Sequence, residues 1–304
     1  MTQVTQLLGS YWTLAVGADP MGEQRCFHDF RVRVETAAKA GFTAMGLWHT
    51  DIAEIRKKYS FKEMKRILND NGITQIEVEW LLDWFCTDNR RGVSDETRKL
   101  LLDAAEGLGA RHIKIGDLGN DCADVPLLTE EFALLCRQAA ERGTNVLFEM
   151  LPAQFSRAPS LDQVLAICRG SGARNGGIML DNLHLQRTGT PPEDIVRKIG
   201  RDMPLGVEIN DGTLATPVNL HDSVVNKRLL PGDGEFDIAA FLHAVWTQGY
   251  DGPVGVEVLN EYIRKWALDT AAREAFAKTR AVVMAAREKW EANQSPLTPH
   301  GGSK

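Results

Sequence analysis

The sequence predicts one α/β domain that is built as a (β/α)8 barrel, and three observations support this. Eight short apolar runs rich in β-branched residues alternate with longer segments whose apolar residues recur every three or four positions. No linker or low-complexity segment interrupts the alternation from Tyr11 to Trp266. Strands that are apolar on both faces and alternate with helices form parallel sheets, and eight such units close most readily into a barrel.

A doubly wound open sheet is the alternative architecture. It is less favoured because no GxGxxG motif follows the first apolar run and because no pattern divides the chain into two halves. The barrel is predicted to occupy residues 1–293, and residues 294–304 are predicted to be a disordered tail. The predicted strands are Tyr11–Val16, Thr43–Trp48, Gln75–Trp80, His112–Gly116, Val146–Met150, Ile178–Asp181, Leu205–Ile209 and Val254–Val258.

Helical patterns fill the intervals between these strands, and a long last helix is predicted over Ala271–Asn293. Side chains that accept hydrogen bonds from free backbone N–H groups are preferred where helices begin. The predicted N-cap residues are Ser60, Ser94, Thr129 and Ser160.

The amino-acid composition limits the classes of partner that the protein is expected to bind. The 304 residues contain 35 Lys and Arg against 41 Asp and Glu, a net charge of -6, which supplies no broad basic surface for nucleic acid. No segment reaches the roughly 18 apolar residues of a membrane span, and the first residues lack a signal-peptide pattern. A cytoplasmic protein without a membrane partner is therefore expected. The five cysteines form no CxxC pair, so buried thiols are expected rather than disulfides or a thiolate zinc site.

Four successive predicted strands carry a carboxylate near their ends: Glu149 in VLFEM, Asp181 in GIMLD, Glu208 in VEIND and Glu257 in VGVEV. The carboxyl ends of barrel strands meet at one end of the fold, where active sites lie. Carboxylates in apolar surroundings need a partner of opposite charge, and one divalent cation would serve all four. Oxygen ligands suit Mn2+ or Mg2+ best, with Co2+ or Fe2+ as further candidates. The alternative is that each carboxylate caps a helix or pairs with an arginine.

Other side chains are candidates for binding a substrate. His184 lies three residues after Asp181 in DNLH, where its ring can point into the mouth of the barrel as a hydrogen-bond donor or proton carrier. Lys114, in HIKIGD, either pairs with a barrel carboxylate or contacts an anionic substrate. Arg228 either binds a carboxylate or phosphate with two hydrogen bonds or stays in solvent.

Aromatic and polar residues also end the second and third predicted strands. Trp48 and His49 end the second strand, and Glu79 and Trp80 end the third, so all four could line the mouth of the barrel. For the tryptophans, stacking on a sugar and packing in the core are both open.

The motifs FEMLP, LDNLH, VEIND, LLPGDGEFD, QGYDGP and VGVEV follow one another between Val146 and Asn260. Together they resemble the sugar phosphate isomerase/epimerase superfamily of xylose isomerase-like TIM barrels, which includes ketose 3-epimerases, inosose dehydratases and dehydroshikimate dehydratases. The resemblance implies that Glu149, Asp181 and Glu257 bind the metal and that His184 contacts substrate. It also implies that these barrels associate as homo-oligomers through edge helices.

Strand seven departs from the pattern of that superfamily. There the superfamily commonly places His, or in some dehydratases Gln, three residues before an Asp, whereas this chain has Glu208 before Asp211. Asp211 is a further candidate for substrate binding. An all-carboxylate ligand set would favour Mg2+ or Mn2+ over Zn2+, and Glu208 is either a ligand or lies behind the ligands.

The predicted function is a divalent-metal-dependent isomerase or epimerase that acts on a small keto sugar or polyol through an enediolate intermediate. The resemblance assigns proton transfer to Glu149 and Glu257. The alternative is a metal-dependent lyase, a dehydratase or β-eliminating enzyme, with His184 as the general acid. An endonuclease on the same barrel is disfavoured by the acidic charge and by a total of seven histidines, and a non-catalytic binding protein stays open because of Glu208.

Overall fold

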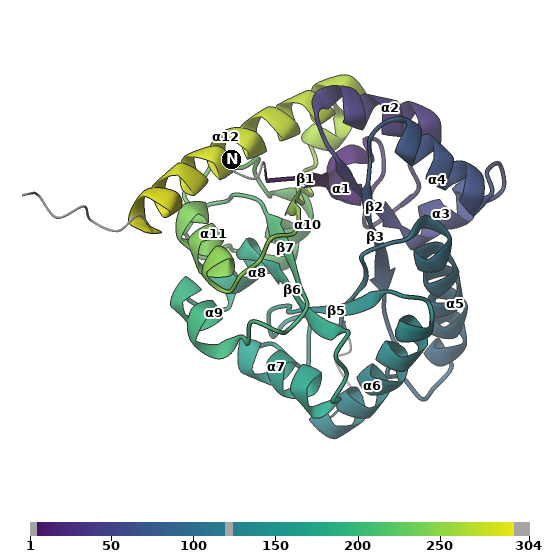
Figure 1. Ribbon diagram of the computed structural model, residues 1–304, viewed down its shortest axis with the longest axis vertical. Helices are drawn as coiled ribbons and strands as arrows, with labels where there is room; N and C mark the ends of the chain where they lie inside the picture. Colours follow the sequence, from purple (N-terminus) through teal and green to yellow (C-terminus); the bar gives the residue numbers. More distant parts are fainter. Residues whose placement is uncertain (1–4, 119–123, 295–304) are drawn as a thin grey trace, which may run out of the picture.

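The computed structural model describes residues 5–118 and 124–294 as one closed barrel surrounded by helices (Figure 1). Each strand pairs in parallel with the next in sequence, and β1 pairs with β8 to close the ring. The prediction of a single (β/α)8 barrel is confirmed. The strands are β1 (Leu7–Gly9), β2 (Ala44–Trp48), β3 (Gln75–Leu81), β4 (His112–Ile115), β5 (Asn145–Glu149), β6 (Gly176–Asp181), β7 (Leu205–Ile209) and β8 (Val254–Val256).

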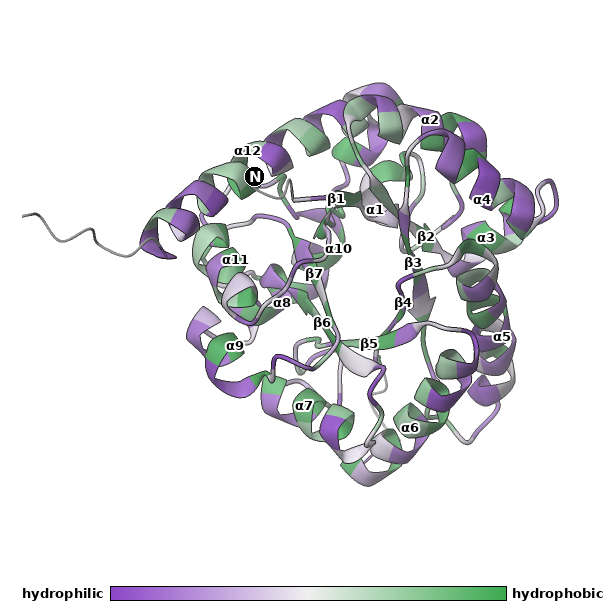
Figure 2. Cartoon of the chain, viewed as in Figure 1, coloured by the Kyte–Doolittle hydropathy of each residue, from purple (hydrophilic) through white to green (hydrophobic). Residues whose placement is uncertain are grey.

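Helices cover the outside of the barrel, with hydrophobic residues turned inward and hydrophilic residues outward (Figure 2). The apolar core lies between the strands and these helices; there Trp84 packs edge-on against Phe148 of β5. The helices are α1 (Tyr11–Leu14), α2 (Phe30–Ala40), α3 (His49–Ile55), α4 (Phe61–Asp70), α5 (Arg90–Leu108), α6 (Val125–Glu141), α7 (Leu161–Gly170), α8 (Asn182–Arg187), α9 (Pro192–Lys198), α10 (Leu220–Asn226), α11 (Ile238–Thr247), η1 (Ile263–Lys265) and α12 (Leu268–Gln294).

The first predicted strand, Tyr11–Val16, is wrong. The strand is the shorter run Leu7–Gly9, and Tyr11–Leu14 forms the helical turn α1. The aromatic and β-branched residues of this segment resemble a strand because they are buried, but they pack at the mouth of the barrel. Thr13 also joins α1 to β8, since its hydroxyl donates to the carbonyl of Val256 at 2.8 Å.

Two of the four predicted N-caps are confirmed. Ser60 and Ser160 accept hydrogen bonds from backbone N–H groups at the starts of α4 and α7. Ser94 and Thr129 instead lie inside α5 and α6, which begin one turn earlier than predicted. Their hydroxyls donate to the carbonyls of Leu82 and Val125. In the sequence, these two polar residues inside helices therefore resembled the N-caps that mark where helices begin.

The last helix and the cysteines were also predicted from the sequence. The last helix, α12, reaches Gln294, and residues 295–304 of the predicted tail lie outside the described residues. Cys86, Cys136 and Cys168 are buried free thiols and Cys26 is a half-buried one, while Cys122 lies outside the described residues. Within the described ranges, none of the helices combines the length and apolar character that crossing a membrane requires.

Small residues inside the barrel leave space for buried charges. Gly46 of β2 faces Glu77 and Glu79 of β3, and a Cβ atom there would lie 2.8 Å from the Glu77 Oε1 atom. Gly255 of β8 similarly faces Glu208, whose Cγ atom would be 3.1 Å from an added Cβ. The interior is therefore shaped to accommodate carboxylates close to the barrel axis.

Candidate functional site

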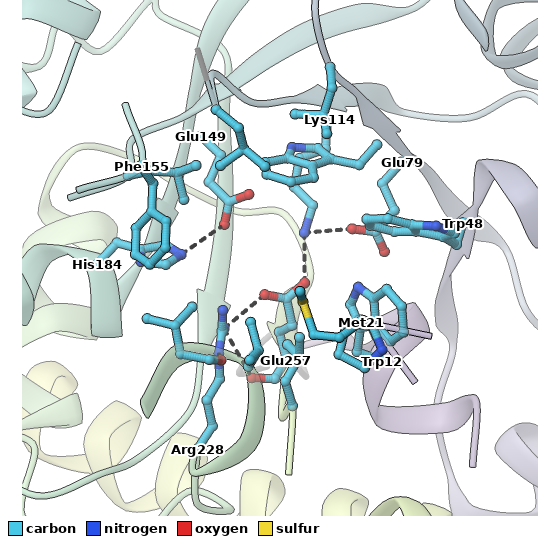
Figure 3. A pocket seen from close by; sticks show the side chains of 18 of the residues that line it. Trp12, Met21, Trp48, Glu79, Lys114, Glu149, Phe155, His184, Arg228 and Glu257 are labelled. Carbon is cyan, nitrogen blue, oxygen red and sulfur yellow. Dashed lines mark hydrogen bonds and ion pairs between the residues drawn. The ribbon is translucent and has the colours of Figure 1, made fainter. Parts of the chain in front are cut away.

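A pocket of about 210 Å³ opens at the carboxyl ends of the strands and has two walls of different chemistry (Figure 3). We use the name charged wall for the set Glu79, Lys114, Glu149, His184, Arg228 and Glu257. We use the name apolar wall for the set Trp12, Met21, Trp48, Trp80 and Phe155.

Lys114 lies at the centre of the charged wall. Alternation along β4 turns its side chain into the barrel, where only 1% of the residue is exposed. Its Nζ atom lies 2.7 Å from Glu79 Oε2, 2.8 Å from Glu208 Oε1 and 2.8 Å from Glu257 Oε1. Burial by itself lowers the pKa of Lys114, but the three carboxylates outweigh burial and raise that pKa well above its ordinary value. Lys114 is a fixed buried cation.

Arg228 supplies the second buried positive charge. Its Nη1 atom donates to Asp181 Oδ2 at 2.7 Å and to Glu257 Oε2 at 2.8 Å. Its Nε atom donates to the carbonyl of Val224 at 2.8 Å. A backbone hydrogen bond from the N–H of Arg228 to the carbonyl of Leu259 ties its loop to the segment after β8. The alternative of an arginine in solvent is wrong, because Arg228 is 3% exposed.

Glu149 and His184 form the side of the charged wall opposite Glu79 (Figure 3). His184 Nε2 lies 3.5 Å from Glu149 Oε1. Burial alone would raise the pKa of Glu149, but Lys114, His184 and Arg228 together lower that pKa to about 2. Glu149 therefore presents a carboxylate, not a carboxylic acid, to the pocket at neutral pH.

The four carboxylates predicted to bind metal are brought together. One oxygen from each of Glu149, Asp181, Glu208 and Glu257 lies within 4.8 Å of the others, and all four residues are buried. These four carboxylates outnumber the two positive charges, those of Lys114 and Arg228, that contact the cluster. In charge and donor type, this cluster can hold a metal ion.

Asp181 is oriented by neighbours that the sequence analysis did not identify. Its Oδ1 atom accepts hydrogen bonds from the backbone N–H of Leu183 at 2.7 Å and from Asn210 Nδ2 at 3.0 Å. Asn210 in turn is held by Asn182, which contacts both backbone groups of Asn210. The sequence contained a signal for both asparagines. Asn182 in LDNLH and Asn210 in VEIND each directly follow the end of a predicted strand that carries a predicted metal ligand.

Glu77 and Glu79 add two carboxylates to the barrel interior. Both lie on the inward face of β3, which the alternation in QIEVEW indicates. Burial raises the pKa of Glu79 to about 8, because the positive charge of Lys114 offsets only part of the effect of burial. Glu77 Oε2 lies 3.1 Å from His112 Nε2, deeper in the barrel. The sequence analysis missed Glu77 and His112, although the same alternation along β3 and β4 could have found them.

Two of the predicted substrate-binding residues do not line the pocket. Asp211 accepts from the backbone N–H groups of Gly212, Gly232 and Phe236 at 2.9 to 3.0 Å, so its carboxylate organises the loop after β7. His49 lies behind the apolar wall, where Nδ1 accepts from the backbone N–H of Trp80 at 3.3 Å.

Trp48, by contrast, lines the pocket as expected. Its ring lies edge-on to Trp12 and stacks on Tyr11, and its Nε1 atom donates to Gln24 Oε1 at 3.0 Å.

Comparison with curated proteins finds two related enzymes. The chain is 26% identical over 235 residues to the 3-dehydroshikimate dehydratase of Pseudomonas aeruginosa, which covers 76% of this chain and 36% of the relative. It is 24% identical over 271 residues to the 3-dehydroshikimate dehydratase of Pseudomonas putida, covering 88% of this chain and 42% of the relative. The chain thus spans less than half the length of the curated relatives that it matches.

Solved structures share the fold. A xylose isomerase-like TIM barrel/4-hydroxyphenylpyruvate dioxygenase fusion protein superposes with a TM-score of 0.81 at 21% identity, covering 98% of this chain and 46% of the other. The IOLI protein with a bound zinc atom gives 0.79 at 18% identity, covering 92% and 99%. An L-ribulose 3-epimerase gives 0.69 at 18% identity, covering 97% and 100%.

The sequence profile of one family covers most of the barrel. The family described as "Xylose isomerase-like TIM barrel" matches residues 34–282, a range that runs from α2 to α12 and includes every residue of the charged wall. The superfamily resemblance noted in the sequence is thereby confirmed, and the chain belongs to the xylose isomerase-like TIM barrel family.

Proposed function

We propose that the chain is a divalent-metal-dependent isomerase or epimerase that moves a proton at a carbon next to the carbonyl group of a small keto sugar or polyol. The observation that carries the proposal is the buried cluster of four strand-end carboxylates, which outnumber the two positive charges, Lys114 and Arg228, beside them. Two of these carboxylates, Glu149 and Glu257, also line the pocket.

Glu149, Asp181 and Glu257 would hold the ion, with Glu208 beside them as a candidate fourth ligand. Oxygen donors of this kind favour Mn2+ or Mg2+. The ion would supply Lewis-acid polarisation of the substrate carbonyl and so make the adjacent C–H group more acidic.

The residues of the charged wall divide the remaining work. Glu149, kept ionised by Lys114, His184 and Arg228, is available to accept a proton from substrate carbon. Glu257, directly after β8, lines the same pocket as Glu149 of β5, so it is the second group for proton transfer and would return a proton to the substrate after taking one up. Lys114 and Arg228 both line the pocket, so their fixed charges can stabilise an oxygen on which negative charge develops.

The apolar wall would bind the carbon face of the substrate. Trp48 lies next to both Trp12 and Trp80, with its ring centroid 4.8 Å from that of Trp12 and 6.1 Å from that of Trp80. Flat aromatic surfaces of this kind pack against the C–H groups of a sugar ring or chain and displace water from the reacting atoms.

A metal-dependent lyase is the second candidate, favoured by the fact that both curated relatives are dehydratases. In that reaction, removal of the same proton is followed by loss of a hydroxyl group from the neighbouring carbon. His184 would then donate the proton that the leaving hydroxyl needs, since it lines the pocket beside Glu149.

The test is exchange of substrate protons with D2O. Protein stripped with a chelator is supplied with Mn2+, Mg2+ or Co2+ and incubated with a panel of keto sugars and cyclic polyol ketones, and NMR follows deuterium entry and products. The proposal expects exchange that requires the metal and yields an isomer. Loss of water would instead establish the lyase, and absence of exchange with every compound and metal would contradict both.

A further inference from the structure

We infer that the substrate carries an aromatic group next to its keto sugar, as an aryl glycoside does, and that this group binds against the apolar wall. The charged wall would bind the sugar part, where the reaction takes place. The inference rests on the proposed function and deepens it, because it narrows the class of keto sugar.

Most of the pocket lining outside the charged wall is apolar. Twenty of the described residues surround the pocket, and six of them form the charged wall. Twelve of the remaining fourteen have aliphatic or aromatic side chains, among them the whole apolar wall. A keto sugar alone carries a hydroxyl group on nearly every carbon, and each hydroxyl that leaves water needs a hydrogen-bond partner. This lining therefore fits an apolar group better than it fits further hydroxyl groups.

The two polar side chains of this lining already have other partners. Gln24 supplies the only side-chain oxygen among the described lining residues outside the charged wall, and this Oε1 atom accepts from Trp48 Nε1 at 3.0 Å. Its amide nitrogen donates to the carbonyl of Pro20 at 3.1 Å. The other polar residue, His221, packs against Phe155 with the ring centroids 5.9 Å apart. Both polar side chains therefore support aromatic rings of the pocket.

Aromatic rings approach the pocket from opposite sides of the barrel. The strands follow one another around the closed ring in sequence order, so β1 and β5 face each other across it. Trp12 follows β1 and Phe155 follows β5, and Figure 3 shows them on opposite sides of the charged groups. Trp48 extends the surface of Trp12, with the ring centroids 4.8 Å apart. An aromatic group in the pocket thus has aromatic partners on two sides, and such rings attract one another beyond simple burial.

The exposure of the lining residues sets the direction in which the substrate lies. Glu79 and Lys114 of the charged wall are buried at the bottom of the pocket. Met21 and Leu118 also line the pocket but are 66% and 40% exposed, so they form its rim. Exposed apolar side chains at the edge of a pocket are typical of a surface that a ligand covers. The sugar therefore points toward the strand ends, and the aromatic group points toward the rim, where the unbranched side chain of Met21 can adapt to it.

The test compares pairs of ligands that differ only in the group at the anomeric carbon. Phenyl and methyl β-D-glucosides, each oxidised to the ketone at C2, C3 or C4, are titrated calorimetrically into protein supplied with Mn2+. In at least one pair, the phenyl compound is expected to bind at least about tenfold more tightly than the methyl compound, because the phenyl ring buries more apolar area.

Two variants locate the bound phenyl group. Phe155→Leu removes an aromatic ring but keeps an apolar side chain, and Met21→Ser removes the apolar side chain at the rim. Each should lower the ratio of phenyl to methyl affinity by at least about threefold. Phe27→Leu is the matched control and should leave the ratio unchanged, since Phe27 lies in the same loop as Met21 and is 71% exposed but does not line the pocket.

Three results would overturn the inference. The first is equal affinity for the two members of every pair, and the second is absence of binding by all of the compounds. The third is a phenyl preference that both variants keep in full, because the phenyl group would then bind elsewhere. The comparison of ligand pairs in the wild type needs no variant, so it decides the outcome even where a variant fails to fold.

These results are separate from the test of the proposed function. A protein that prefers the phenyl compounds but exchanges no substrate proton would contradict only the proposed function. A protein that shows metal-dependent exchange but binds the phenyl and methyl compounds equally well would contradict only the inference.

Discussion

The two walls of the pocket are held in place in different ways. Half of the charged wall, Glu79, Lys114 and Glu149, extends from barrel strands, and the ion pairs of Lys114 join β3, β7 and the residue directly after β8. Much of the apolar wall comes from segments between strands, such as Trp12 in α1 and Met21, which is 66% exposed. Lys114 thus ties the charged wall to the closed barrel, whereas the apolar wall rests in part on segments that can vary without moving the strands.

The largest expected effect comes from breaking the charged wall. Glu149→Gln removes the carboxylate proposed to accept the substrate proton but keeps the side-chain volume. Turnover should fall by at least about a thousandfold, measured by deuterium exchange, with little change in the melting temperature. The control is Glu193→Gln, on the exposed surface of α9. A Glu149→Gln protein with full activity would refute the assigned role.

A pH titration tests the support behind the apolar wall. Burial lowers the pKa of His49 to about 4, from an ordinary value of 6.5, so the folded protein holds this ring neutral. The resulting stability is present above pH 6.5 and is lost as pH falls toward 4, by about 3 kcal/mol. His49→Asn keeps an acceptor for the Trp80 N–H group but cannot titrate.

The free energy of unfolding of the wild type should therefore drop relative to that of His49→Asn between pH 6.5 and 4. Chemical denaturation at a series of pH values measures the difference. Parallel curves for the two proteins would show that His49 does not titrate as described.

The third prediction concerns the space beneath the charged wall. Gly46→Ala would place a Cβ atom 2.8 Å from Glu77 Oε1 and 3.0 Å from the backbone N of Tyr11, and should destabilise the protein by about 2 kcal/mol. Gly92→Ala, in α5 with no neighbouring atom within 4 Å, should instead stabilise it by about 0.5–1 kcal/mol. Urea denaturation gives both values, and equal effects at the two sites would contradict the packing described.

The smallest effect is expected from the apolar wall. Trp48→Leu removes an aromatic face but keeps an apolar side chain, so KM should rise about tenfold while kcat changes little. Trp266→Leu is the control, since Trp266 is 38% exposed and does not line the pocket. A fall in kcat at constant KM would instead place Trp48 among the groups that act on the reacting atoms.

The sequence predicted the barrel because each strand repeats the same short, doubly apolar pattern. The predicted strand Leu205–Ile209 agrees with β7 at both ends. The first strand failed because Tyr11 and its neighbours are buried for a different reason, in packing at the barrel mouth. A short strand of three residues, Leu7–Gly9, carries too little pattern to compete with that signal.

The four carboxylates of the candidate site could also be predicted, since strand ends converge in any such barrel. The sequence also indicated that Lys114 could pair with a barrel carboxylate, but not with which ones. Lys114 pairs with Glu208 and Glu257, which lie 94 and 143 residues away, and only the register of the closed sheet brings these residues together. The backbone contacts of Asp211 could not be predicted, because in a sequence a carboxylate that binds backbone N–H groups in a turn looks the same as one that binds substrate.

The central claim is that the charged wall holds one divalent ion, and the position of that ion is its most direct test. Anomalous diffraction from crystals grown with Mn2+ would locate it. The account predicts one peak in contact with Glu149, Asp181 and Glu257. A pocket that binds no Mn2+, or an ion that contacts none of these three carboxylates, would contradict it.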